Sequence, residues 1–213
     1  MIRDKIEVMD IIKKNKIISI IRTDNFEKAL KSAVAIIDGG IRVLEFSYTM
    51  SFAGELITEL TQKYKNTDVL IGAGTVLDPE TAKIALAMGS QFIISPCLNS
   101  ETAKMCLRYQ IPYMPGAMTI KETVECMEAG ADIVKIFPSE LFGPSIIRAI
   151  KGPIPQAPLM PTGGVNIDNI HTWFEAGSMA VGIGRNLYVS ADSGDYESVT
   201  SLAKSYVNKI TSI

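Results

Sequence analysis

The sequence predicts a parallel α/β fold, and more specifically a single (β/α)8 barrel over residues 1–213. Two regularities of the chain lead to this prediction. Short apolar runs recur at a regular spacing, and amphipathic segments with apolar residues three and four positions apart lie between them. Several of these segments end on glycine just before the next run, as expected where a helix stops and a strand begins after a short turn.

The apolar runs are the expected strands, at 17–21, 43–46, 69–71, 92–95, 112–115, 133–137, 159–161 and 180–184. An extra helix at 4–14 is expected before the first strand. Further helices are expected at 26–37, 52–64, 79–88, 100–109, 120–127, 168–175 and 198–210, with glycines at 39–40, 89, 130 and 177 preceding the next strands. The Gly/Pro-rich stretch 151–158 is interpreted as a stiff loop. Eight repeated units favour a closed barrel over a doubly wound open sheet, since no G-x-G-x-x-G motif follows the first strand.

The composition argues against several classes of partner. The net charge is −2 without a basic run, so we expect no binding to nucleic acid or acidic membranes. No segment is apolar enough to span a bilayer or to act as a signal peptide. Three cysteines predict no disulfide and a cytoplasmic location, and a single histidine excludes a zinc site built on two or three histidines of one chain. Neither a metal nor a cofactor is expected.

Lys135 is the most informative residue of the chain. It lies in the apolar run Asp132–Pro138 and alternates there with Ile133 and Phe137. A strand of this type is covered on both faces, and loss of water disfavours the ammonium form and lowers the pKa of a lysine. A neutral amine attacks carbonyl carbon, so Lys135 predicts Schiff-base chemistry. The alternative is a lysine at a strand end whose ammonium group reaches solvent.

Further polar residues are expected at the carboxyl ends of the strands, where such barrels build their active sites. Glu45 is a lone carboxylate in an apolar strand; it is either a general acid/base with a raised pKa or the partner of Lys135 or Arg22 in an ion pair. Arg22 ends the first strand and is either a two-pronged donor to a substrate carboxylate or a solvated arginine. Thr75 lies in the glycine-rich turn 72–75, where the hydroxyl and the amides can hold a carboxylate.

Two glycine clusters follow the last two expected strands. Gly163 and Gly164 come after the seventh strand, and Gly184 precedes Arg185 after the eighth. In many (β/α)8 barrels these two loops and a helix N-terminus hold a phosphate through backbone N–H groups. We therefore expect these four residues to bind an anionic group, although each cluster alone is also typical of ordinary turns.

Several motifs in this order resemble one known family. They are G-G-I-R-V-L-E at 39–45, I-G-A-G-T-V-L at 71–77, F-I-I-S-P at 92–96, V-K-I-F-P-S-E at 134–140 and P-T-G-G-V at 161–165. Together they resemble the 2-keto-3-deoxy-6-phosphogluconate / 4-hydroxy-2-oxoglutarate aldolase family, from about Lys16 to Asp195. The resemblance implies a class I, metal-free aldolase, usually a homotrimer, on a (β/α)8 barrel. Such an enzyme cleaves a small 2-oxo-4-hydroxy acid into pyruvate and an aldehyde.

The resemblance also implies roles for individual residues. Lys135 matches the Schiff-base lysine and Glu45 matches the acid/base that moves protons. Thr75 matches the threonine at the pyruvyl carboxylate, and Pro96 lines the same pocket. The glycines at 163–164 match those of the phosphate loop.

Two positions depart from the family pattern. Thr49 stands where some members have an arginine that binds the substrate carboxylate, so we expect Arg22 to take over that role beside Thr49. Arg185 stands where phosphate-binding members often have serine, and it could hold a phosphate or a second carboxylate. The expected substrate is 2-keto-3-deoxy-6-phosphogluconate, which gives glyceraldehyde 3-phosphate, or 4-hydroxy-2-oxoglutarate, which gives glyoxylate; a galactonate-derived isomer is a further possibility.

Two other functions remain open at this point. A sugar-phosphate isomerase or epimerase on the same barrel would share the phosphate loops but would not need a buried lysine in the sixth strand. A non-catalytic barrel that binds a phosphorylated acid would form no covalent adduct and would show no turnover.

Overall fold

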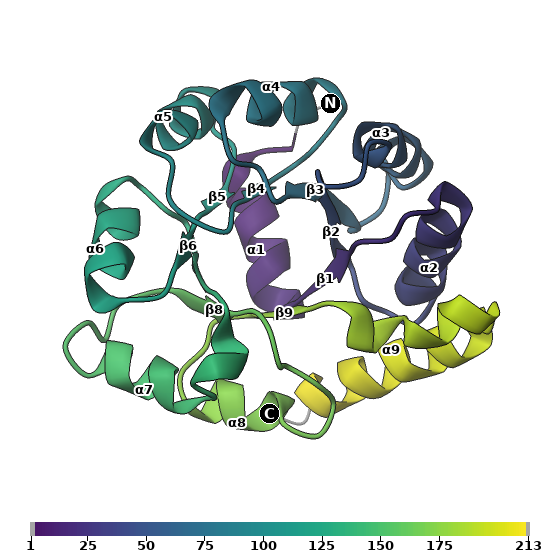
Figure 1. Ribbon diagram of the computed structural model, residues 1–213. Helices are drawn as coiled ribbons and strands as arrows, with labels where there is room; N and C mark the ends of the chain where they lie inside the picture. Colours follow the sequence, from purple (N-terminus) through teal and green to yellow (C-terminus); the bar gives the residue numbers. More distant parts are fainter. Residues whose placement is uncertain (1–2, 212–213) are drawn as a thin grey trace.

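Parallel strands form the inner layer of the molecule, and helices surround them (Figure 1). The computed structural model of the chain describes residues 3–211. Its strands are β1 (Ile17–Ile21), β2 (Val43–Ser47), β3 (Leu70–Gly74), β4 (Ile93–Ile94), β5 (Tyr113–Met114), β6 (Gly116–Ala117), β7 (Val134–Ile136), β8 (Leu159–Pro161) and β9 (Val181–Ile183). Every strand pair is parallel, which confirms the predicted α/β class.

The prediction of one complete eight-stranded barrel is not confirmed. The described residues form a curled six-stranded sheet in the order β5-β4-β3-β2-β1-β9 and a separate three-stranded sheet in the order β6-β7-β8. The expected fifth strand is divided at Pro115, because proline has no N–H group to donate to a neighbouring strand. Between β8 and β9 the pairing is reduced to an isolated bridge from Thr162 to Gly182.

The helices lie close to their predicted positions. They are α1 (Lys5–Asn15), α2 (Phe26–Asp38), α3 (Ala53–Lys63), α4 (Pro79–Ala87), α5 (Ser100–Tyr109), α6 (Ile120–Glu128), α7 (Ser145–Lys151), α8 (Ile170–Glu175) and α9 (Tyr196–Thr211). Short 3-10 helices lie at η1 (Ser139–Leu141), η2 (Arg185–Leu187) and η3 (Val189–Ser193). The sequence analysis did not predict α7, which has only 7 residues.

Local sequence explains where many helices begin and end. Side chains of Asp4, Asn25, Asp78, Asn99 and Thr119 accept a hydrogen bond from a backbone N–H in the first turn of the following helix. Of the glycines expected before strands, those at 40, 89, 130 and 177 adopt positive φ, whereas Gly39 has a helical φ of −75°.

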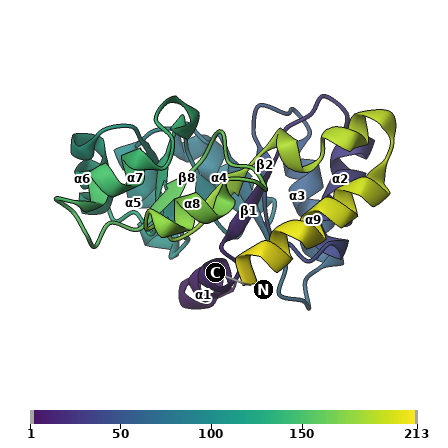
Figure 2. The ribbon, with the colours of Figure 1, turned by 90° about the horizontal axis from the view of Figure 1, so that it is seen from below.

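Two separate apolar clusters hold these layers together. The larger one lies between the sheets and the surrounding helices. The smaller one fills the space inside the curled sheets with alternate strand residues such as Val43 and Ile133, and Val8 and Ile12 of α1 close it from one end (Figure 2). At the end of this cluster opposite to α1, where the strands have their carboxyl ends, the side chains are polar instead of apolar.

Residues 3–211 also bear on the expectations about membrane spans, metal sites and disulfides. In this range no helix is long and apolar enough to cross a membrane. The same residues contain no cluster of three or more histidine, cysteine, aspartate or glutamate side chains suited to a metal ion. The three cysteines are free thiols.

Candidate functional site

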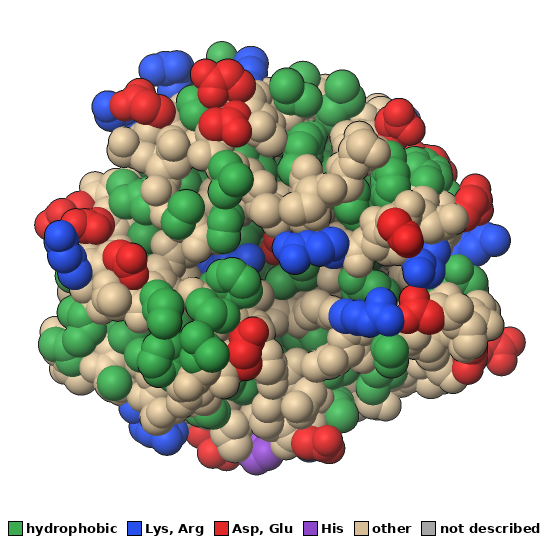
Figure 3. All heavy atoms as spheres, in the orientation of Figure 1, with side chains coloured by type: hydrophobic (Ala, Val, Ile, Leu, Met, Phe, Trp, Pro, Cys, Tyr) green, Lys and Arg blue, Asp and Glu red, His purple; other side chains and the backbone are tan. Residues whose placement is uncertain are grey.

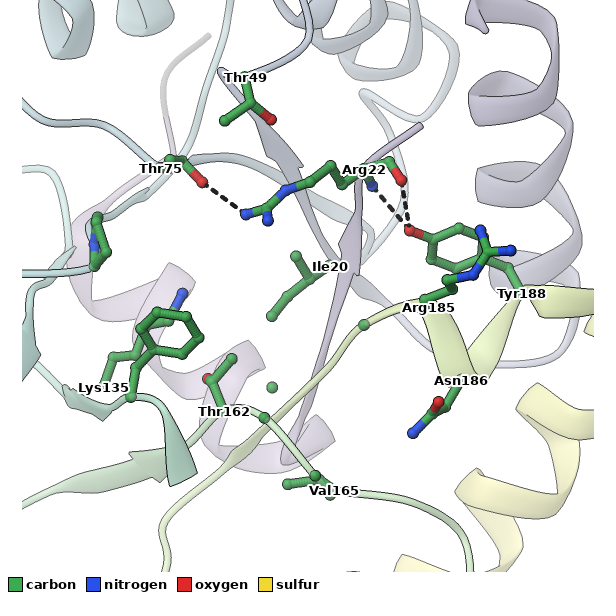
Figure 4. Close-up of a pocket in the computed structure, with 16 residues that line it drawn as sticks. Ile20, Arg22, Thr49, Thr75, Lys135, Thr162, Val165, Arg185, Asn186 and Tyr188 are labelled. Atoms are coloured by element: carbon green, nitrogen blue, oxygen red, sulfur yellow. Dashed lines mark hydrogen bonds between the residues drawn. The ribbon is translucent and has the colours of Figure 1, made fainter. Parts of the chain in front are cut away.

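A pocket of about 640 Å³ opens at the carboxyl ends of the strands (Figure 4). In the space-filling view, lysine and arginine side chains gather around the hollow at the centre of this face (Figure 3). Nine of the residues predicted from the sequence line the pocket, namely Arg22, Thr49, Thr75, Pro96, Lys135, Gly163, Gly164, Gly184 and Arg185. The strand ends therefore bring residues from seven segments of the chain to one place.

Lys135 lies in the middle of β7 and reaches into this pocket (Figure 4). Ile133, two positions before Lys135, belongs to the apolar cluster inside the sheets, and Phe137, two positions after it, lines the pocket. Ile133, Lys135 and Phe137 therefore all lie on the inner face of the sheet, as their alternation in the sequence predicted. The residue is only 6% exposed, and Nζ lies 5.1 Å from the centroid of the Phe137 ring. Lys135 forms no ion pair with any described residue, so its amine is directed at the pocket without a carboxylate partner.

Glu45 lies on the inner face of β2, below the pocket rather than in its lining. It is 1% exposed, and neither carboxyl oxygen has a hydrogen-bond partner among the described residues. Burial raises the pKa of Glu45, and the positive charges of Lys135 and Arg22 oppose this rise. The alternative of an ion pair with Lys135 or Arg22 is not realised within the described part of the chain. An unpartnered, buried carboxyl group with a raised pKa is suited to proton transfer.

Two glycines of β3 make room for side chains of the neighbouring strands, and one of these side chains is Glu45. A Cβ atom at Gly74 would lie 1.6 Å from Oε1 of Glu45, and a Cβ atom at Gly72 would lie 2.2 Å from the Phe92 ring. Side chains of the neighbouring strands occupy the space instead.

Arg22 forms a connected cluster with the hydroxyl groups of Ser47, Thr49 and Thr75; Figure 4 shows Arg22 and the two threonines on one side of the pocket. Nε of Arg22 donates to Oγ of Ser47 at 3.3 Å, and Nη2 donates to Oγ1 of Thr75 at 3.2 Å. Oγ of Ser47 lies 2.9 Å from Oγ1 of Thr49 and 2.8 Å from Oγ1 of Thr75. Arg22 forms no ion pair within residues 3–211, so its guanidinium group offers an unneutralised charge to an anion.

The backbone of Arg22 is fixed from the opposite side by Tyr188, which follows η2. Its hydroxyl accepts a hydrogen bond from the Arg22 N–H at 2.9 Å and donates to the Arg22 carbonyl at 3.0 Å. The tyrosine thus connects the segment after β9 to the carboxyl end of β1.

The turn after β8 forms another wall of the pocket. Gly163 and Gly164 have φ values of 100° and 73°, which favour glycine, and a Cβ atom at Gly163 would meet the carboxylate of Glu140 at 1.6 Å. The next helix, α8, begins only at Ile170, so the expected helix N-terminus does not adjoin these glycines. Any anion held here would be bound by backbone groups of the turn itself.

Arg185 lies at the rim of the pocket, beside Tyr188 (Figure 4). Its guanidinium group forms an ion pair with Asp192, and Nζ of Lys28 lies 2.9 Å from the same carboxylate. Both cations lower the pKa of Asp192, and the hydrogen bond from Lys28 has the largest effect. Asp24 also lies 4.0 Å from Nζ of Lys28, so the charges of the two cations are balanced by two carboxylates.

The sequence analysis did not select Ser47, Thr162 or Tyr188. Ser47 alternates with Glu45 along β2, which placed it on the inner face, and Thr162 directly precedes the glycine pair. Thr162 is buried and lines the pocket, and its Oγ1 atom is itself buried without a hydrogen-bond partner within the described chain. No sequence signal pointed to Tyr188, because its contact with Arg22 joins residues 166 positions apart.

Comparisons with known proteins give a consistent result. The model of the KDPG and KHG aldolase family matches residues 8–202. The chain is 33% identical over 203 residues to a 2-dehydro-3-deoxy-phosphogluconate aldolase of Treponema pallidum, covering 93% of this chain and 95% of the relative. It is 35% identical over 181 residues to a 2-dehydro-3-deoxy-6-phosphogalactonate aldolase of Escherichia coli, covering 84% and 88%. A crystal structure of KDPG aldolase from Legionella pneumophila, with pyruvate captured as a covalent carbinolamine intermediate, superposes with a TM-score of 0.85 at 28% identity and covers 93% and 97%.

Proposed function

The chain belongs to the KDPG and KHG aldolase family and is a carbon–carbon lyase, and we propose that it acts through a Schiff base at Lys135. The single observation that carries the proposal is the buried amine of Lys135, which faces a pocket above the unpartnered carboxyl group of Glu45. The isomerase and the non-catalytic barrel are disfavoured, because neither accounts for this pair of residues or for the family.

In the proposed reaction, Nζ of Lys135 attacks the keto carbon of a 2-oxo-4-hydroxy acid and forms a carbinolamine. Loss of water then gives a protonated imine. As the C4 hydroxyl loses its proton, the C3–C4 bond breaks and its electron pair moves into the imine, which releases the aldehyde and leaves an enamine. Protonation of C3 and addition of water release pyruvate and restore the amine. Side chains of the protein supply all groups in this scheme, so it requires no metal or cofactor.

Glu45 is proposed to carry the protons in these steps. Burial raises the pKa of its carboxyl group above the ordinary value of a glutamate. The group can therefore give a proton to the departing water and recover one from the C4 hydroxyl. Its electrostatic interaction with both Lys135 and Arg22 supports a position close to the reacting atoms.

We propose that the two ends of the substrate bind on different walls of the pocket. Arg22, Thr49 and Thr75 provide donors for the carboxylate next to the keto group, with Pro96 beside them. Backbone groups of Gly163, Gly164 and Gly184 together with Arg185 would receive the second anion. The unpaired guanidinium group of Arg22 and the backbone N–H groups of the glycine turn support a substrate with an anionic group at each end.

The proposed substrate is 2-keto-3-deoxy-6-phosphogluconate, which yields pyruvate and glyceraldehyde 3-phosphate. The Arg185 guanidinium group at the rim can also receive a carboxylate, and one relative is a KHG/KDPG aldolase, so 4-hydroxy-2-oxoglutarate, which yields glyoxylate, is the second candidate. Comparison of kcat/KM for the two acids, in the wild type and in Arg185→Ser, tests this choice. A loss confined to the phosphorylated acid in the variant would assign Arg185 to the phosphate.

The wider organisation of the protein is also a proposal. We propose that residues 1–213 form one cytoplasmic domain in which the two sheets close into a (β/α)8 barrel. Backbone hydrogen bonds across both gaps, from Lys135 N to Pro115 O and from Met179 N to Leu159 O, support the closure. Exposed Leu141 and Phe142, in and after η1, support burial against other copies in a homotrimer. Light scattering of the purified protein would test the trimer.

Borohydride trapping tests the central claim. Pyruvate and borohydride should add a stable mass to the peptide that contains Lys135, because hydride transfer to the imine carbon gives a secondary amine. Lys135→Met should show neither the adduct nor aldol cleavage while it remains folded. Normal cleavage by a protein whose Lys135 stays unmodified under these conditions would refute the assignment.

A further inference from the structure

Ser47 occupies a central place in the donor cluster although it does not line the pocket. It ends β2, pairs in register with Gly74 of β3, and is 0% exposed. Its Oγ atom contacts pocket-lining residues on both sides, namely Arg22 from β1 and Thr75 after β3, as well as Thr49 in the turn that follows. One buried hydroxyl group therefore joins three side chains from three successive strands.

From these contacts we propose that Ser47 is a positioning residue that holds Arg22, Thr49 and Thr75 ready for the carboxylate of the 2-oxo acid. The inference rests on the proposed function and deepens it, since it concerns the recognition of the same substrate. Ser47 itself makes no contact with the ligand in this proposal.

Counting protons shows why the arrangement suits an anion. Ser47 has one proton and can donate across only one of its two short contacts, to Thr49 or to Thr75. Both threonines cannot donate to Ser47, because its oxygen also accepts the Nε–H of Arg22 and a longer 3.4 Å contact from the Thr49 N–H. When one threonine accepts from Ser47, the proton of that threonine is free to be donated to another acceptor, such as a carboxylate in the pocket.

The guanidinium group is oriented by the same oxygen. Two hydroxyl oxygens accept from Arg22, and no described carboxylate neutralises it. Hydroxyl acceptors fix the direction of the side chain without cancelling its charge, so the remaining N–H groups keep their full attraction for a carboxylate. Without Ser47, Nε of Arg22 would lose its acceptor and the two threonine hydroxyls would lose the contact that links them.

The test uses the full-length protein and pyruvate as the probe, with borohydride trapping at Lys135 as the readout. Ser47→Ala is expected to raise the half-saturating pyruvate concentration by about 10-fold, the size expected when a hydrogen bond to a charged group is lost. The trapping rate at saturation should stay within about 2-fold, because imine formation at Lys135 does not involve Ser47. Ser47→Cys, which keeps the side-chain size but offers a weak acceptor, should behave in the same way and carries the test if Ser47→Ala does not fold.

Ser32→Ala is the matched control, because Ser32 is a buried serine of α2 whose Oγ has no hydrogen-bond partner among residues 3–211. It should leave both parameters unchanged. Unchanged half-saturation in a folded Ser47 variant, or a loss confined to the saturating rate, overturns the proposal for Ser47. Absence of any adduct in the wild type would instead refute the proposed function, so the two failures are distinguishable.

Discussion

At the scale of single residues, the site depends on polar groups that are kept away from water. Burial of a carboxyl group without a partner is costly unless the group stays protonated. Burial accordingly raises the pKa of Glu45, and its close packing against Gly74 leaves no room for a larger residue at position 74. The protein thus accepts a local loss of stability in order to keep an acid at the base of the pocket.

Replacement of Glu45 by Gln tests the proposed proton transfer. The amide is similar in size to the carboxyl group but cannot exchange a proton, so kcat for cleavage should fall by about 100- to 10,000-fold. Pyruvate should still bind, because the donors on Arg22 and Thr75 are untouched. Steady-state kinetics with 2-keto-3-deoxy-6-phosphogluconate measure the change, and a variant with at least half of the wild-type kcat would show that Glu45 is not the acid/base.

The same residue predicts a pH dependence of stability. The folded state raises the pKa of Glu45 above its ordinary value of 4.5, so the folded state binds the proton more tightly than the unfolded chain. The free energy of unfolding should therefore decrease as pH rises from about 4.5 through the raised pKa. Urea unfolding of the wild type and Glu45→Gln at several pH values isolates this contribution, because the variant lacks the titrating group. Parallel stability curves for the two proteins would contradict the raised pKa.

At the scale of elements, contacts between distant segments position the site. Tyr188 holds the carboxyl end of β1 through both backbone groups of Arg22. Tyr188→Phe removes both hydrogen bonds but keeps the packing, so KM for the 2-oxo acid should rise about 5- to 10-fold, corresponding to about 1 kcal/mol, with little change in kcat. Tyr206→Phe, which removes another buried tyrosine hydroxyl in α9, is the control. A larger effect on kcat than on KM would place Tyr188 in the chemical step.

The elements also show what the sequence could and could not predict. The hydrophobic periodicity and the glycines at helix ends predicted the positions of most helices and strands, because these signals are local. The break at Pro115 and the short α7 were missed, since a two-residue strand or a seven-residue helix carries almost no periodic signal. Lys135 and Glu45 stood out because a charge in an apolar strand needs a local explanation. Ser47 and Tyr188 were not selected, because their importance comes from partners on other strands.

At the scale of the whole molecule, the two ends of the inner core have different tasks. Polar groups fill the end at the carboxyl termini of the strands, whereas α1 seals the opposite end with Val8, Met9 and Ile12. In folds of this kind the first end carries the reaction and the second contributes stability.

Ile12→Ala tests this division of tasks. Ile12 is 1% exposed, and its truncation leaves a cavity in the inner cluster, which should lower the free energy of unfolding by about 2–5 kcal/mol. The pocket lies at the other end of the strands, so kcat and KM should stay within about 2-fold at a temperature where the variant is folded. Ile6→Ala on the exposed side of the same helix, where Ile6 is 71% exposed, should change neither stability nor kinetics by much. A fall in kcat that accompanies the loss of stability in the folded Ile12 variant would mean that α1 also shapes the reactive end, because the interior filling would then transmit its packing to Glu45 and Lys135.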